Sequence, residues 1–154
     1  GITIVVITHE MAVIKTICHR VAVMEEGRVV EMGNVYDVFS NPQQPITKKF
    51  ISSTSALSKI GALISEDKEL TNPSNGKLIK LQFGKDSVGD ALISDVSRRF
   101  NVNINIVLAN VEILQGASLG SMIALIKGNE DDINKALDYI KENHVNVSNI
   151  GGNE

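Results

Sequence analysis

The sequence predicts an α/β protein of the α+β type, with a regular βαββαβ unit in its second half. From residue 77 onward, stretches in which every second residue is apolar alternate with stretches in which apolar residues recur every three to four positions. The first half contains a β-branched run and a hairpin signal, which predict strands there as well. Because 43% of the 154 residues are apolar, the chain can bury a core and fold.

The first half is predicted to begin with a strand over Ile4–Thr8, a β-branched run that ends at His9. Apolar residues then recur at helical spacing. Further on, Glu25, Glu26 and Gly27 separate two short apolar runs, a pattern typical of a hairpin. Another short helix is expected before a proline ends it. After the first strand, the expected elements are a helix, two hairpin strands and a helix, at about residues 12–21, 21–24, 28–31 and 35–39.

Residues 51–75 are predicted to be a linker. The run Glu66–Glu69 is charged, and Asn72–Gly76 is rich in residues that form turns. Composition of this kind is typical of solvated chain between folded parts. We therefore expect two domains, at residues 1–50 and 76–150.

The second half has the more regular pattern. Asn129 is expected to cap its last helix, and the acidic residues 130–132 that follow favour the positive end of the helix dipole. The predicted elements are strand, helix, strand, strand, helix and strand, at about residues 77–83, 88–100, 102–113, 119–127, 129–140 and 145–147. This order is that of a ferredoxin-like sandwich, in which both helices cover one face of an antiparallel sheet.

The other face of that sheet is expected to be apolar. Residues 121–126 are apolar on both sides of their strand, and the preceding strand places Val107 and Ala109 beside Asn103 and Asn105. A domain that stood alone in water would have a polar second face. An apolar face with two amides set into it is therefore expected to be a protein interface, a ligand site or both, with a contact between two copies as the first expectation.

Composition excludes several classes of protein. The net charge of −3 and the absence of a basic run argue against nucleic acid as a partner. Cys18 is the only cysteine, so a disulfide within the chain is impossible and a reducing compartment such as the cytoplasm is expected. No metal site is expected at Cys18 and His19, because no third ligand stands at metal spacing. No apolar run reaches the roughly 18 residues that span a bilayer.

Residues 2–50 resemble the last part of the ATPase domain of an ABC transporter. The resemblance is carried by ITIVVITHEM, followed by ICHRVAVMEEGRVVEMGNVYDVFSNPQQPITKKF. It implies that His9 is the switch-loop histidine, a catalytic residue that helps to position the γ-phosphate of ATP in the intact ATPase. Since the chain also starts directly in a strand-like run, we expect it to be a C-terminal fragment of a longer protein.

The chain by itself is not expected to be an ATPase. It has no Gly-rich loop ending in Gly-Lys-Ser or Gly-Lys-Thr. In the family, the Walker A loop, the signature motif and the Walker B acids all precede the switch loop. ATP and Mg²⁺ are therefore cofactors expected of the intact protein, and this chain is expected to carry none. Without those groups His9 would have nothing to act with.

Residues 77–150 resemble the NIL domain, the C-terminal regulatory domain of the ATPase subunit of methionine importers and a relative of the amino-acid-binding ACT domains. The resemblance is carried by RRFNVNINIVLANVEILQG and SLGSMIALIKG. It implies a regulatory domain that binds L-methionine and gives feedback inhibition of uptake, as a homodimer formed through the C-terminal sheet. The intact subunit would be peripheral to the inner face of the cell membrane, bound to a membrane permease subunit.

The resemblance also implies a site. Asn105 matches the family's ligand-contacting amide, and Asn103 is its neighbour on the same face. An amide offers a donor and an acceptor to the charged end of an amino acid, while Val107, Ala109 and Met122 would line a slot for a thioether chain. The alternative is that both amides are simply solvated at a sheet edge.

The sequence is compatible with three functions. The first expectation is an effector-binding regulatory module, which would bind L-methionine saturably. The second is a domain that serves dimerisation only, which would form a stable dimer and ignore amino acids. The third is an ATPase, which the missing phosphate-binding loop disfavours.

Overall fold

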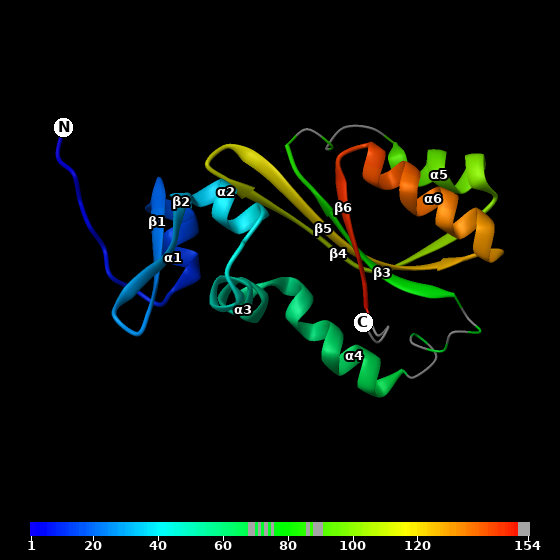
Figure 1. Ribbon diagram of the computed structural model, residues 1–154, viewed down its shortest axis with the longest axis horizontal. Coiled ribbons are helices and arrows are strands. Elements are labelled where there is room, and N and C mark those ends of the chain that lie inside the picture. Colours follow the sequence, from blue (N-terminus) through cyan, green and yellow to red (C-terminus); the bar gives the residue numbers. More distant parts are fainter. Residues whose placement is uncertain are drawn as a thin grey trace. The chain divides into compact units, whose positions relative to one another are not determined.

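The computed structural model divides into two compact units (Figure 1). The first comprises Gly1–Ser55 and Ile113–Ala117, and the second comprises Ala56–Glu112 and Ser118–Glu154. Every helix in the described part of the chain is too short or too polar to span a bilayer. The structure describes residues 1–67, 70, 72, 74, 76–85, 87 and 91–150.

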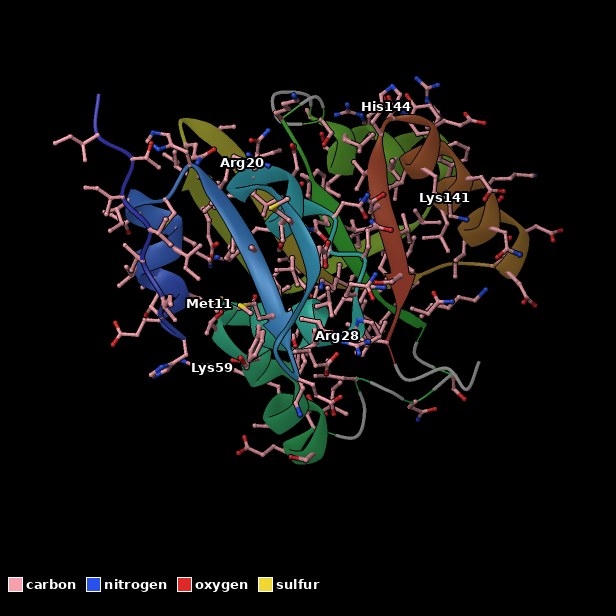
Figure 2. The ribbon with its side chains drawn as sticks, turned by 60° about the vertical axis from the view of Figure 1, so that its left-hand side comes forward. Met11, Arg20, Arg28, Lys59, Lys141 and His144 are labelled. Carbon is pink, nitrogen blue, oxygen red and sulfur yellow. The ribbon has the colours of Figure 1, made fainter. Side chains whose placement is uncertain are left out.

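The first unit contains a hairpin, as the sequence predicted. β1 (Arg20–Glu25) pairs antiparallel with β2 (Arg28–Asn34). The turn residues Glu26 and Gly27 have φ angles of 50° and 77°, and both lie in the left-handed region that a two-residue hairpin turn of this type requires. Arg20 and Arg28 mark the two ends of the hairpin (Figure 2). The helices of this unit are α1 (Met11–Ile17), α2 (Val35–Ser40) and α3 (Pro45–Thr54).

The predicted first strand is wrong. Residues Ile4–Thr8 have no partner strand among the described residues, and the side chains of Ile4 and Ile7 are 78% and 97% exposed. β-branched residues favour an extended backbone, but a strand is completed only by hydrogen bonds to a neighbouring strand. Val21, which we placed both at the end of the first helix and at the start of the hairpin, belongs to β1.

Glu31 connects β2 to the start of α3. Its carboxylate accepts hydrogen bonds from the backbone N–H groups of Gln43 and Gln44, at 2.9 and 3.0 Å. The N-cap residue Gln44 supplies no side-chain hydrogen bond of its own, so Glu31 satisfies donors that the helix end leaves open.

The same contacts favour the charged form of the Glu31 carboxyl. Burial raises its pKa, but the nearby Thr47 hydroxyl, the amides of Gln43 and Gln44, and the Lys48 ammonium together lower the pKa below its usual value. The Thr47 hydroxyl is buried and makes no hydrogen bond of normal geometry to the described residues. The backbone amides are therefore the clearest structural cause of the lowered pKa.

The second unit is built on a four-stranded sheet with the order β4-β5-β3-β6. β3 is central and pairs antiparallel with both β5 and β6. The βαββαβ order predicted from periodicity is confirmed. The strands are β3 (Lys77–Phe83), β4 (Asn103–Leu114), β5 (Ala117–Lys127) and β6 (Val145–Asn149).

Two helices, α5 (Leu92–Phe100) and α6 (Glu130–Glu142), cover one face of this sheet. Asn129 caps α6 as predicted, since its side-chain oxygen accepts the Asp132 N–H at 2.9 Å. The Tyr139 hydroxyl of α6 donates to the Asp95 carboxylate of α5 at 3.0 Å and joins the two helices. The start that we predicted for the first of these helices, residues 88–90, lies outside the described residues.

The segment predicted to be a linker contains helical structure. After the end of α3, the 3₁₀ turn η1 (Ala56–Lys59) leads directly into α4 (Ile60–Glu66). Leu57, Ile60 and Ile64 recur at helical spacing and form a short apolar stripe. The polar and small residues around them made this stripe easy to overlook in the sequence. This stripe packs against the four-stranded sheet.

We expect Glu31→Gln to destabilise the start of α3 by about 1 kcal/mol at neutral pH, because a charged acceptor for two open donors is replaced by a weaker neutral one. Since the folded-state pKa is lowered, this stabilisation is present above the unfolded-state pKa and is lost as the pH falls through the folded-state value. Amide hydrogen exchange at Gln43 and Gln44, measured at neutral pH and in acid, checks this.

The matched control is Glu25→Gln, which removes the same charge from an exposed strand end and is expected to leave that exchange unchanged. Equal exchange in Glu31→Gln and in the unmodified chain at neutral pH would contradict a capping role for Glu31.

Candidate functional site

β5 is apolar on both of its faces, as predicted. Ala124 and Ile126 lie in the core beneath α5 and α6. Ile123 and Leu125, which alternate with them, point the other way and join Leu78 of β3 in a second cluster. Ile123 is only 1% exposed and Leu125 only 4%. The second face of the sheet therefore carries an apolar patch that is shielded from water, and Lys80 and Gln82 of β3 lie on the same face beside it.

The chain itself supplies that shield. Leu57 of η1 packs with the second cluster, and so do Ile60 and Ile64 of α4. Figure 1 shows α5 and α6 on one side of the sheet and α4 on the other. We expected this face to be uncovered within one copy, and that expectation is wrong, because the supposed linker carries apolar side chains of its own. Their spacing of three and four residues is the signal that could have revealed them.

Asn103 and Asn105 lie on β4, an edge strand of the sheet. Ile104 between them packs against the helix-side core, so strand alternation directs both amides toward the second face. Both residues are exposed. Within the part of the chain that the structure describes, neither side chain forms a hydrogen bond. Their donors and acceptors are therefore open to water or to a ligand.

The three predicted apolar partners do not share one surface. Val107 packs with the second cluster, on the side of the amides. Met122 packs against the helix-side core, on the opposite face of the sheet. Ala109 is exposed on β4. The structure thus brings Val107 together with the side of Asn105 but does not bring Met122 there.

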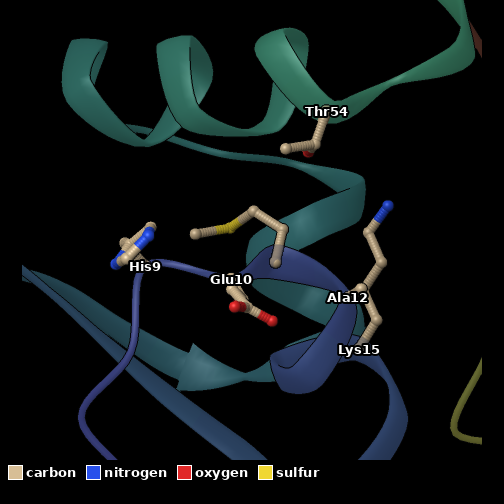
Figure 3. A pocket seen from close by; sticks show the side chains of 6 residues that line it. His9, Glu10, Ala12, Lys15 and Thr54 are labelled. Carbon is tan, nitrogen blue, oxygen red and sulfur yellow. The ribbon is translucent and has the colours of Figure 1, made fainter.

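His9 lies in the first unit, at a bend just before α1, and is exposed. It lines an open hollow of about 400 Å³ with neighbours from α1 and from the end of α3. Figure 3 shows His9 and Lys15 on opposite sides of this hollow. The Lys15 ammonium lies 5.3 Å from the centre of the Phe39 ring. The two basic groups do not converge on one point, so the hollow offers no formed phosphate site.

The described residues offer no metal centre. No group of three or more His, Cys, Asp or Glu side chains within them is placed to hold a metal ion. Cys18 is a free thiol that is partly buried. The features that remain are the exposed amides and the apolar second face of the sheet.

Comparison with known proteins shows which proteins this chain resembles. Residues 77–149 match the family described as the NIL domain. The chain is 40% identical over 151 residues to methionine import ATP-binding protein MetN 3 of Pectobacterium atrosepticum, covering 98% of this chain and 44% of that protein. It is 42% identical over 147 residues to MetN 1 of Bacillus cereus, covering 96% of this chain and 41% of that protein.

A relative from Lactococcus lactis subsp. cremoris, also named methionine import ATP-binding protein MetN, is 36% identical over 152 residues, with 98% of this chain and 41% of that protein covered. The chain thus spans about two fifths of the length of these curated relatives. A crystal structure of the C-terminal domain of an ABC transporter / ATP-binding protein from Enterococcus faecalis covers 61% of this chain and 98% of that one, at 20% identity and a TM-score of 0.49, a likeness too remote to inform function. Almost the whole chain is therefore similar to proteins named methionine import ATP-binding proteins, and its residues 77–149 match the NIL domain.

Proposed function

We propose that the second unit of this chain is a regulatory domain that binds L-methionine. In the intact transporter subunit, the bound amino acid slows methionine import when it is abundant, as feedback inhibition. The observation that carries the proposal is the pair of exposed amides on an edge strand, Asn103 and Asn105, beside an apolar sheet face that includes Val107. The NIL match and the names of the relatives support methionine as the effector.

The chemistry of the site suits an amino acid with a thioether chain. An amide can accept from the ammonium group and donate to the carboxylate of the same ligand. Val107 provides an apolar contact two residues along the strand, and Ala109 leaves room for a chain to pass. Met122 packs on the other face of the sheet, so we leave it out of the proposed site.

In the intact protein, residues 1–50 are the end of an ABC ATPase domain and residues 51–75 join it to the NIL domain at 76–150. His9 is then the switch-loop histidine, which acts on ATP with Mg²⁺ only when the preceding part of that domain is present. The intact subunit associates with a membrane permease and is peripheral to the inner face of the cell membrane. Relatives named as ATP-binding import proteins support this assignment.

A homodimer formed through the sheet is part of the proposal, and dimerisation without an effector is the alternative function. The edge strand β4 leaves one row of backbone N–H and C=O groups unpaired within the described sheet. Its sequence contains neither Lys nor Pro, the residues that usually protect an edge. Ile106 and Val111 on this strand are 51% and 67% exposed. These features favour pairing with a second copy.

We expect Asn105→Ala to weaken L-methionine binding by about 1 to 3 kcal/mol, which is about five- to 150-fold, because polar groups of the ligand would be buried without a partner. Titration calorimetry with L-methionine measures the change. The matched control is Asn146→Ala, which removes an exposed strand amide from β6, the opposite edge strand, and is expected to leave affinity unchanged.

Equal affinity in Asn105→Ala and in the unmodified chain would remove Asn105 from the site. No saturable binding by the unmodified chain would leave dimerisation as the better-supported function.

We expect the chain to be a dimer by sedimentation, and we expect Val111→Lys to shift it toward monomer, because a charge on an exposed edge opposes strand pairing. Ser148→Lys places the same charge on the other edge strand, at an exposed position, and is expected to leave the dimer intact. If the unmodified chain sediments as a monomer at high concentration, both the sheet dimer and the dimerisation-only alternative are ruled out.

A further inference from the structure

The two faces of the NIL-domain sheet are covered very unequally. α6 alone buries four apolar side chains against the helix-side core, whereas α4 buries none completely. α4 is attached through Ile60 and Ile64, with Leu57 of the preceding turn, and both isoleucines remain partly exposed. One layer is therefore integral to the core, while the other rests on it through a few side chains.

α4 also has little stability of its own. It is seven residues long, and its N-cap residue Lys59 makes no side-chain hydrogen bond to the first turn. No acidic residue lies in that turn to favour the helix dipole. Gly61 lies within the helix, where glycine is disfavoured. Helices this short are marginal in water unless contacts hold them, so the contacts of Ile60 and Ile64 decide whether α4 stays in place.

The surface beneath this helix is the one that the proposed effector would use. Leu78, Ile123 and Leu125 are nearly inaccessible while η1 and α4 are in place. Val107, two residues from Asn105 on β4, packs against the same cluster as Ile60 and Ile64. An apolar ligand chain that reached past Val107 onto this face would meet those isoleucines.

We propose that Ala56–Glu66 is a displaceable cover that competes with the effector for the second face of the sheet. This inference rests on the proposed function, because it takes L-methionine as the ligand that binds when the cover has moved aside. The apparent affinity then equals the intrinsic affinity multiplied by the fraction of molecules that are open. The residues that hold α4 on the sheet therefore set the methionine concentration at which the domain is half saturated, although they do not contact the bound ligand.

Loosening the cover tests this with the full 154-residue chain. Ile64→Ala removes a side chain that holds α4 on the sheet, so L-methionine should bind at least about fivefold more tightly by titration calorimetry. Leu63→Ala is the matched control. It makes the same kind of truncation one residue away, at an exposed position outside the cluster, and should change affinity by less than about twofold.

Tightening the cover should have the opposite effect. Gly61→Ala favours the helix, and among the described residues no atom beyond the adjoining residues and the helix's own backbone lies within 4 Å of the added methyl group. The closed form should gain, and methionine affinity should fall by about three- to fivefold. A general disturbance of the fold would weaken binding in both variants, so opposite changes in Ile64→Ala and Gly61→Ala identify competition.

The outcomes separate the two proposals. If the unmodified chain binds methionine but Ile64→Ala binds equally or less well while circular dichroism shows it folded, the cover is overturned and the effector site stands. If no variant binds methionine, the proposed function fails, and amide hydrogen exchange without ligand then decides whether the cover is displaceable. Faster exchange in α4 than in α6 supports displacement, and exchange of both helices at one common rate overturns it.

Discussion

A strand with apolar side chains on both faces has to be covered twice. β5 is such a strand: Ala124 and Ile126 face one way, and Ile123 and Leu125 face the other. Because water would be in contact with one set or the other, a single layer of helices cannot stabilise the sheet. α5 and α6 meet half of the requirement, and η1 with α4 meets the rest. The arrangement of the whole NIL domain follows from this one element.

This requirement also places the chain's own helix on the surface of the proposed regulatory site. The second face of the sheet is where the family-based proposal puts an amino acid, and it is where the chain's own helix lies. The exposed amides of Asn103 and Asn105 stand at its margin, on an edge strand whose backbone is free on one side. The ligand, a second copy of the chain and α4 are therefore candidates for adjoining surfaces. Their relative binding free energies decide which of them is bound.

Periodicity predicted most of the fold, because a few local signals dominate it. The hairpin follows from the backbone freedom that Gly27 gives to its turn, and Asn129 caps α6 through a bond three residues along the chain. Signals of this kind lie within a few consecutive residues, so they can be read directly from the sequence. The strand predicted over Ile4–Thr8 failed because strand formation needs a partner, which local sequence does not specify.

The candidate site was predicted less well, and the reason is geometric. Alternation shows that neighbouring side chains point to opposite faces, but it does not show which residues of two adjacent strands share a face. That depends on register between strands, and so Met122 was grouped with Val107 although the sheet separates them. α4 was overlooked because three apolar residues among serines and charges are a weak pattern.

The extended run at the start of the first unit affects the handling of the protein. Ile2 and Val5 are 92% and 85% exposed, and Ile7 is 97% exposed, in a stretch with no charged residue and no proline. Such a stretch tends to associate with the same stretch of a second molecule. Two molecules joined there weigh the same as two joined through the NIL sheet, so mass alone does not distinguish the two assemblies, whereas a crosslink mapped to one segment does.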